Sequence, residues 1–343
     1  MKKILVSALE PSANLHLEPV LKLIGDYEIK GVFDEKFGKP LYPSSDFSIM
    51  GFFDVFLKIK KAKKAITQMS KLSLKCDKVL LIDSPAFNLP LAKAIKKINP
   101  SIEIIYYILP KVWAWKEKRV AKVEKYCDKL ASIFPFENKF YHKSIYVGNP
   151  LLDEIKTYKS KVTNYGITAF LPGSRKSEIK PLISIYKKVA KEIKGKKFLV
   201  IPKYFSNEEI KELYGDISNF TVKRDTIQAL NESDFAFICS GTATLEAAIV
   251  GVPFVLVYKA KKIDYLIAKR FVKLKYVGLA NIILNFEGFN SLHKEFIQDE
   301  ATEVNLLKIY KSCNKEEFFM QSKKLKKILK HGSALEVASL LSD

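Results

Sequence analysis

The amino-acid sequence predicts an α/β protein made of two doubly wound domains. Short β-branched and aromatic runs alternate with longer helical patterns, and these runs fall into two sets that are separated near the middle of the chain. The length of 343 residues also exceeds what one domain usually holds. Alternation of this kind is typical of right-handed βαβ units, whose parallel sheets are covered by helices on both faces.

The first set of predicted strands begins at the N-terminus, where the apolar stretch of MKKILVSALE meets Glu10 too early for a signal peptide and indicates a strand instead. Helical patterns lie between most of the strands. The six members of this set are Ile4–Ala8, Ile29–Phe33, Lys78–Ile82, Glu103–Ile108, Leu130–Phe134 and Ile145–Val147.

A lysine-rich stretch at residues 154–165 indicates a linker, after which the second set begins. The chain ends in a lysine-rich helical region from Glu316 to Leu341. We therefore expect a first domain at residues 1–160, a second at 161–315 and C-terminal helices at 316–343. The five strands of the second set are Ala169–Leu171, Phe198–Ile201, Phe220–Val222, Phe235–Ile238 and Phe254–Val257.

Composition indicates an anionic partner. Lys and Arg number 58 against 37 Asp and Glu, a net charge of +21. This excess fits nucleic acid, an anionic membrane surface or a phosphorylated substrate, although lysine can also be a default surface residue. No nucleic-acid motif is present, which makes nucleic acid the weakest of the three. The four cysteines are scattered, which favours a reduced, cytosolic chain.

The stretch MGFFDVFLKIKKAKKAI, residues 50–66, combines aromatic bulk with a lysine cluster. A helix of this kind can lie in a lipid interface, with aromatic rings inserted and ammonium groups on headgroup phosphates. It can equally be an ordinary amphipathic helix packed on its own core. The candidate lipid contacts are Phe52, Phe53 and Phe56.

Two strand ends in the second half predict a nucleotide site. In LPGSRKSE, Gly173 turns the chain, Ser174 can cap a helix and Arg175 offers a planar donor fork that suits a pyrophosphate. In FICSGTATLE, small residues precede a helix N-terminus, where free N–H groups attract an anion. Each motif alone is also compatible with a turn and a helix cap. The second motif supplies Ser240, Gly241, Thr242 and Glu246, the last as acceptor for a ribose hydroxyl.

Strand ends in the first half carry candidate acid–base residues. Asp83 in LIDSPAFN ends a buried strand, where partial desolvation suits a general base, although a helix cap or salt bridge is also possible. The stretch SALEPSANLH brings Glu10, Ser12 and His16 to the same edge of the sheet. We expect no metal, because no ligand cluster occurs at a strand end.

The stretch YYILPKVWAWKEKRV, residues 106–120, holds both tryptophans of the chain beside several cations. Tryptophan rings bordered by cations would form an apolar surface with a positive edge, which suits an acceptor that is phosphorylated, lipid-like or sugar-like. Packing in the core readily explains one of these tryptophans, but it explains the presence of both less readily. The candidate acceptor residues here are Trp113, Trp115, Lys116 and Arg119.

These motifs in this order resemble the lipid-A-disaccharide synthases, inverting glycosyltransferases of lipid A biosynthesis. The matching stretches run in unbroken order from Glu10 to about Leu284. They are LEPSANLH, SIMGFFDV, IDSPAFN, YYILPKVWAWKEKRV, FPFENKFY, VGNPL, LPGSR, SGTATLEAAIVGVP and KYVGLANIIL.

The resemblance implies a GT-B fold, with two Rossmann-like domains facing across a cleft and C-terminal helices returning to the first domain. It implies a peripheral enzyme on the cytoplasmic face of the inner membrane that needs no cofactor. Its substrates would be UDP-2,3-diacylglucosamine and 2,3-diacylglucosamine 1-phosphate, joined by a β-1,6 bond with release of UDP. A homodimer is left open.

Carried over by position, the resemblance makes Asp83 the base that takes the acceptor 6-hydroxyl proton. Asn281 joins the UDP side with Arg175 and the SGTATLE residues. Glu10, Ser12 and His16 line the opposite side with Asn88 as a further acceptor contact. The sequence departs from the usual family pattern chiefly in its first half, at Ala13, Asn14, Ala86 and Asn149.

Two alternatives remain open at the level of sequence. One is another GT-B enzyme of UDP-sugars, such as an epimerase or a peptidoglycan glycosyltransferase, in which neither the tryptophan stretch nor the Phe/Lys helix is expected. The other is a membrane-surface protein that binds UDP-sugar without turnover, suggested by the acids lost from the first half.

Overall fold

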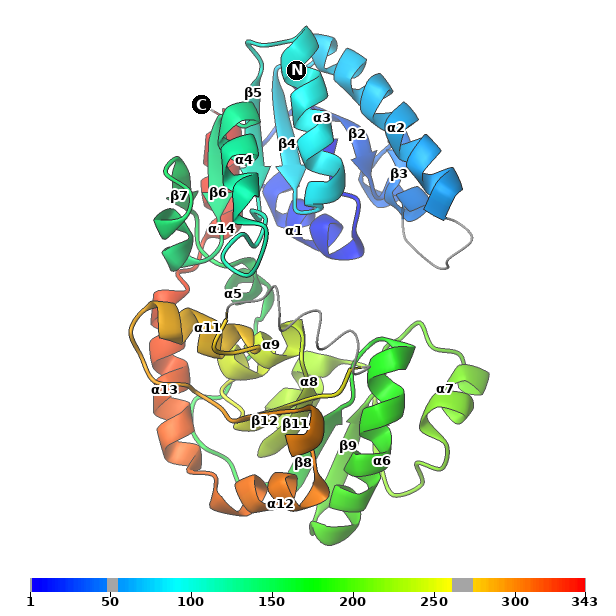
Figure 1. Ribbon diagram of the computed structural model, residues 1–343, viewed down its shortest axis with the longest axis vertical. Coiled ribbons are helices and arrows are strands. Elements are labelled where there is room, and N and C mark those ends of the chain that lie inside the picture. The colour runs from blue at the N-terminus through cyan, green and yellow to red at the C-terminus, as the bar shows by residue number, and fades with distance from the viewer. Residues whose placement is uncertain (1, 48–54, 261–273, 343) are drawn as a thin grey trace. The chain divides into compact units, whose positions relative to one another are not determined.

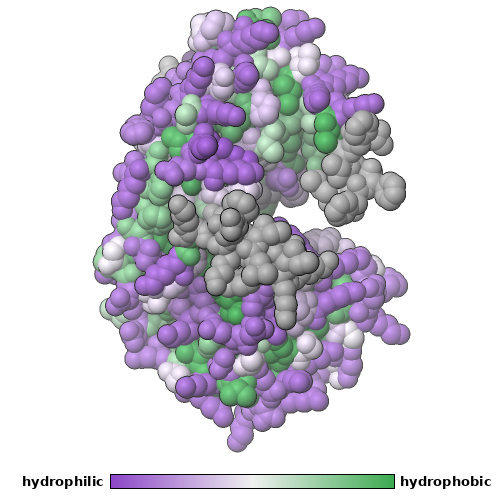
Figure 2. All heavy atoms as spheres, viewed as in Figure 1, coloured by the Kyte–Doolittle hydropathy of each residue, from purple (hydrophilic) through white to green (hydrophobic). Residues whose placement is uncertain are grey.

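The chain folds into two compact units, each built on one parallel sheet. The structure is a computed structural model that describes residues 2–47, 55–260 and 274–342 (Figure 1). Unit 1 comprises residues 1–153 and 329–343, and unit 2 comprises residues 154–328. Hydrophilic residues cover most of the face of each unit that is seen in Figure 2. The prediction of an α/β protein with two parallel sheets is confirmed.

Unit 1 contains a seven-stranded sheet in the order β3-β2-β1-β4-β5-β6-β7. Its central strands are almost fully buried because helices cover both faces, which explains why their sequences are continuous apolar runs. β1 and β4 are neighbours, with Ser7 paired to Leu81, so their carboxyl ends lie side by side. The strands are β1 (Lys2–Ser7), β2 (Tyr27–Phe33), β3 (Tyr42–Pro43), β4 (Lys78–Ile82), β5 (Glu103–Tyr107), β6 (Lys129–Ser132) and β7 (Ser144–Tyr146).

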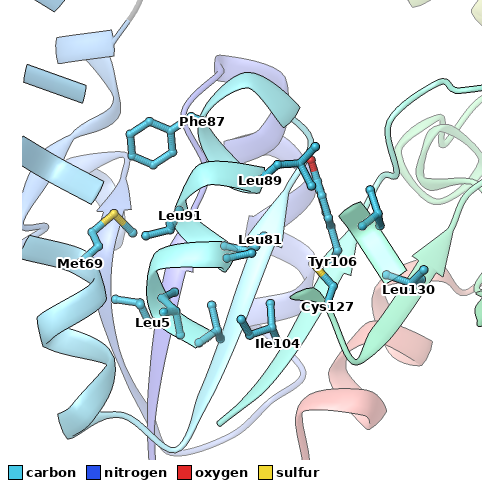
Figure 3. Close-up of a cluster of buried hydrophobic side chains, with 14 of the residues drawn as sticks. Leu5, Met69, Leu81, Phe87, Leu89, Leu91, Ile104, Tyr106, Cys127 and Leu130 are labelled. Atoms are coloured by element: carbon cyan, nitrogen blue, oxygen red, sulfur yellow. The ribbon is translucent and has the colours of Figure 1, made fainter. Parts of the chain in front are cut away.

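The helices of unit 1 form two groups around this sheet. α2, α3 and α4 pack in sequence against one another, while α1 packs against α14 (Figure 1). The core beneath α2 and α3 joins Met69 and Leu91 to strand residues such as Leu5 and Leu81 (Figure 3). The helices are α1 (Pro11–Leu21), α2 (Val55–Leu72), α3 (Pro85–Ile98), α4 (Val120–Tyr126), α5 (Pro150–Glu154) and α14 (Ser333–Ser342).

Unit 2 contains a six-stranded parallel sheet in the order β10-β9-β8-β11-β12-β13. The carboxyl ends of β8 and β11 are adjacent, with Leu171 paired to Ile238. Both nucleotide motifs of the sequence follow these two strands. The strands are β8 (Ile167–Leu171), β9 (Lys196–Val200), β10 (Thr221–Lys223), β11 (Phe235–Cys239), β12 (Phe254–Tyr258) and β13 (Glu295–Ile297).

The helices of unit 2 also fall into two groups. α6 contacts α7 and α12, whereas α9 contacts α8, α11 and α13. The helices are α6 (Lys176–Glu192), α7 (Asn207–Tyr214), α8 (Thr226–Glu232), α9 (Thr242–Val250), α11 (Leu279–Phe286), α12 (Glu303–Ser312) and α13 (Lys315–Ile328).

Two connecting regions differ from what the sequence suggested. The stretch that the sequence suggested as a linker is fixed against unit 2, because the Lys159 backbone N–H donates to Val250 O at 2.9 Å and its ammonium donates to Asn231 O. At the C-terminus, the structure assigns α13 to unit 2 and α14 to unit 1, whereas the sequence grouped these helices together.

Within the described ranges, no helix is both long and apolar enough to cross a bilayer.

Candidate active site

A candidate binding site of unit 2 is a cavity of about 380 Å³ at the carboxyl ends of its strands. In open parallel sheets this edge is where ligands bind. The cavity brings together both sequence motifs, although Ser174 and Ser240 are 66 positions apart in the chain. Its polar lining residues are Ser174, Arg175, Glu178, Arg224, Thr226, Ser240, Thr242 and Glu246, and Gly173 and Gly241 contribute backbone.

The loop after β8 is held in place by a carboxylate. Glu178 accepts hydrogen bonds from the backbone N–H groups of Ser174 and Arg175, both at 3.2 Å, and pairs with Arg175 Nη1 at 3.1 Å. Gly173 has φ +108°, and a Cβ there would lie 2.7 Å from Glu178 Oε2, so only glycine fits. The Arg175 side chain is 80% exposed and therefore available to a ligand.

The loop after β11 leads directly into the N-terminus of α9. Gly241 caps this helix with φ 153°, and no atom lies within 4 Å of where its Cβ would be. Thr242 is exposed, while Thr244 turns its hydroxyl back to Gly241 O at 2.8 Å. The start of α9 therefore presents open backbone to the cavity, where helix N–H groups favour a negatively charged ligand.

Glu246 lies one turn into α9 and lines the same cavity. Burial raises the pKa of its carboxyl group to about 7, and repulsion from Glu154 and Asp225 adds to the shift. A carboxyl group with this pKa is an effective hydrogen-bond partner for a sugar hydroxyl near neutral pH.

Besides Glu178, two polar residues of the cavity were not predicted from the sequence. Arg224 follows β10 and Thr226 begins α8, and both line the cavity. Arg224 Nη1 donates to Pro202 O at 2.8 Å, which anchors the guanidinium at the cavity wall. Arg224 could have been predicted from the rule that ligands bind at the carboxyl ends of strands, because it lies two residues beyond the predicted strand Phe220–Val222.

In unit 1, Asp83 lies directly after β4 in a sharp turn. Asp83 and Ser84 both have left-handed backbone conformations, with φ 48° and 43°. Such conformations cost non-glycine residues about 1–3 kcal/mol each and cluster at functional sites. The Ser84 hydroxyl is also buried and lacks a hydrogen-bond partner among the described residues. Strain and an unpaired polar group at one strand end support a functional role for this turn.

The candidates after β1 lie at the neighbouring strand end. Glu10 and Ser12 are exposed at the start of α1, and the His16 ring is partly buried, in edge contact with Tyr107 at 6.5 Å between centroids. Since β1 and β4 are adjacent, the structure places these residues and Asp83 at one edge of the sheet.

Three residues expected to contact ligand are instead part of the protein interior. Asn281 is fully buried, donates to His293 O and Glu295 Oε1, and accepts from Leu292 N–H, so it lies outside the cavity. Asn88 is also fully buried. Trp113 is 7% exposed, and its indole N–H donates to Glu137 at 3.1 Å.

The remaining acceptor candidates are at the surface of unit 1. Trp115 is 47% exposed, with Lys116 Nζ 4.0 Å and Arg119 Cζ 5.5 Å from its ring centroid. Trp115 is therefore an exposed aromatic ring with two cations close to it, and its contact with an acceptor stays a prediction. Phe52 and Phe53 lie outside the described residues, and the side chain of Phe56 is likewise not described.

Comparison with known proteins identifies the family. The family described as "Lipid-A-disaccharide synthetase" matches residues 4–338. The chain is 50% identical to lipid-A-disaccharide synthase of Campylobacter jejuni, with all of both chains covered. It is 48% identical to the enzyme of Helicobacter pylori strain G27, covering 99% of this chain and 98% of that one. The chain belongs to the lipid-A-disaccharide synthetase family. The prediction of a glycosyltransferase of lipid A biosynthesis is confirmed.

Solved structures show how this lipid-A-disaccharide synthetase chain relates to a broader fold. MurG of Acinetobacter baumannii is similar with a TM-score of 0.62 at 15% identity, covering 99% of both chains. A UDP-GlcNAc 2-epimerase of Neisseria meningitidis, solved with bound UDP-GlcNAc, is similar with a TM-score of 0.57 at 13% identity. These likenesses establish the GT-B fold.

Departures from the usual family motifs are accommodated inside unit 1. Asn14 is buried, donates to Ala8 O at 2.9 Å and accepts from Asp34 N–H at 2.8 Å, which joins the end of β1 to the end of β2. Asn149 is buried and donates to Ile133 O at 3.2 Å. Both asparagines therefore stabilise the unit that carries Asp83.

Proposed function

We propose that this enzyme transfers the sugar of UDP-2,3-diacylglucosamine to the 6-hydroxyl of 2,3-diacylglucosamine 1-phosphate. The product is a β-1,6-linked acylated disaccharide 1-phosphate, and UDP is released. The observation that carries the proposal is the unit 2 cavity, which unites the Arg175 loop, the start of α9 and Glu246 in a chain of this family. The epimerase alternative is not favoured, since the chain belongs to a different family.

The donor's diphosphate is assigned to the part of the cavity between Arg175 and the start of α9. A guanidinium can grip a pyrophosphate through two parallel hydrogen bonds, and a helix N-terminus adds open N–H groups. Glu246 then meets a ribose hydroxyl one helical turn away. Arg224 adds a second guanidinium to the cavity and supplies further donors to the nucleotide.

The chemistry is a single displacement with inversion at the donor's anomeric carbon. The Asp83 carboxylate takes the proton of the acceptor 6-hydroxyl while the oxygen of that hydroxyl forms a bond to the anomeric carbon. The bond between the anomeric carbon and the UDP oxygen breaks, and the charge left on UDP is stabilised by Arg175 and the α9 N–H groups. Glu10, Ser12 and His16 contact the acceptor beside Asp83.

The acceptor and donor are anionic lipids, so the enzyme visits them at the cytoplasmic face of the inner membrane. The net charge of +21 and the exposed lysines of α2 support attraction to anionic headgroups. Trp115, flanked by Lys116 and Arg119, provides a further surface for the acceptor phosphate and sugar.

The direct test is turnover with both lipid substrates in detergent, followed by mass spectrometry of products. The wild type should form the disaccharide 1-phosphate and one UDP per product, whereas Asp83→Asn should form almost none while still binding UDP. Tight binding of the UDP-sugar without release of UDP would indicate a protein that binds the donor but does not catalyse transfer. Isomerisation of the UDP-sugar without acceptor would indicate an epimerase instead.

A further inference from the structure

We propose that Tyr106, Asn88 and Ser7 form a positioning network that fixes the direction of the Asp83 side chain. The inference rests on the proposed function, in which Asp83 is the general base, and concerns residues that do not themselves touch substrate. Each of the three is fully buried in unit 1, at 0% exposure.

The turn that carries Asp83 needs external support. Only Asp83 and Ser84 separate the end of β4 from Pro85, the first residue of α3. Both residues are in the left-handed region, where a side chain crowds its own backbone. A strained strand-to-helix turn persists only when the surrounding structure determines it, and its benefit is a side chain held out at the top of the sheet.

The support acts on both backbone groups of Asp83. Its N–H donates to Tyr107 O at 3.0 Å. Its carbonyl oxygen accepts two hydrogen bonds, from the Tyr106 hydroxyl at 2.7 Å and from Asn88 Nδ2 at 2.8 Å. With the amide and carbonyl planes both fixed, the direction of the bond from Cα to Cβ is fixed as well.

Asn88 is in turn oriented by Ser7. The Ser7 hydroxyl donates to Asn88 Oδ1 at 2.6 Å, which leaves the amide nitrogen facing Asp83 O and also Ile82 O at 3.1 Å. The network therefore spans β1, β4, β5 and α3. Figure 3 shows the ring of Tyr106 among the buried side chains of this core. Its hydroxyl leaves that core to reach the carbonyl oxygen of Asp83 in the turn.

Tyr106→Phe removes one hydroxyl and leaves the buried ring in place. Tyr141→Phe is a matched control, because Tyr141 is also fully buried in the same core and donates to a carbonyl, Pro110 O, at 2.7 Å. We expect similar small losses in melting temperature for both variants. Only Tyr106→Phe should lower kcat, by at least about tenfold, with the KM for the UDP-sugar changed less than about twofold. Ser7→Ala should show the same separation of kcat from KM.

A double-mutant cycle shows whether Tyr106 acts through Asp83. In an Asp83→Asn background, Tyr106→Phe should produce no further loss of the residual rate, because the base that it positions is absent. Equal kcat values for Tyr106→Phe and Tyr141→Phe, or a full further loss in the Asp83→Asn background, would overturn the inference. Absence of turnover in the wild type, or near wild-type turnover in Asp83→Asn, would instead overturn the proposed function and the inference with it.

Discussion

Under the proposed function, Glu246 would serve the nucleotide site at a cost in stability. It lines the unit 2 cavity, yet its environment is poor for a charge, since burial and two nearby carboxylates, Glu154 and Asp225, disfavour ionisation. No hydrogen bond to this carboxyl group from the described residues offsets that cost. A group retained under such conditions is more easily explained by a ligand than by folding.

The pKa of about 7 predicts how stability should change with pH. The carboxyl group binds its proton more tightly in the folded state than at its ordinary value of 4.5, so the stability contributed by the protonated form is present at low pH. That contribution is lost as pH rises from about 4.5 through about 7. Above this range the folded protein holds an unfavourable charge.

Glu246→Gln should therefore raise the free energy of unfolding at pH 8 by about 1–2 kcal/mol and have much less effect at pH 5. The same substitution should weaken UDP binding. Denaturant unfolding at both pH values measures the first effect, with Glu212→Gln at an exposed site of unit 2 as the control. Equal gains at pH 5 and pH 8 would argue against the shifted pKa.

The placement of some individual side chains could not be predicted from the sequence. The motifs located both halves of the cavity, but a motif does not tell which of its polar residues face the ligand. Asn281 satisfies its amide with His293, Leu292 and Glu295, partners whose proximity depends on how α11 packs beside β13. Asn88 likewise meets Ser7, which is 81 positions away in the chain.

At the level of elements, α2 separates an inward apolar face from an outward basic one. Ala65 and Met69 are fully buried in the unit 1 core, while Lys60, Lys63 and Lys64 are exposed. The core-packing interpretation of this helix thus holds for its described part, while the exposed lysines lie on its outward face, where a charged surface could reach them. The two interpretations from the sequence are compatible.

Replacing Lys60, Lys63 and Lys64 by Glu should reduce sedimentation with anionic vesicles several-fold at low salt, because each basic residue near such a surface contributes about 1 kcal/mol. The matched control changes Lys188, Lys191 and Lys194, three exposed lysines of unit 2, by the same total charge. Equal loss in both triple variants would mean that only net charge matters. Undiminished sedimentation of the α2 variant would remove this helix from the membrane contact.

Most strands could be predicted because buried parallel strands are continuous apolar runs. Two strands were not predicted: β3, with two residues, and β13, with three, which lie at edges of the two sheets. β3 has only two residues and β13 begins with Glu295, so neither offers a run of apolar residues long enough to indicate a strand.

At the scale of the whole molecule, the chain returns to unit 1 after completing unit 2. α14 packs against α1 and β5, and its start is fixed by Asp153, which accepts hydrogen bonds from the backbone N–H groups of Gly332 and Ser333 at 2.8 Å. Ser333 also meets the Tyr107 hydroxyl at 3.1 Å. Unit 1 therefore depends on the last residues of the chain, a dependence that no local sequence pattern reveals.

The central claim is that UDP binds in the unit 2 cavity, on Arg175 and the start of α9. Calorimetric titration of UDP into the wild type and Arg175→Ala tests it most directly, with Lys176→Ala as the control, because Lys176 is the adjacent cation but pairs with Glu209 and does not line the cavity. We predict that Arg175→Ala weakens binding by about 1.5–3 kcal/mol, the scale of a charge-assisted hydrogen bond, and that Lys176→Ala has little effect. Unchanged affinity in Arg175→Ala would contradict the account.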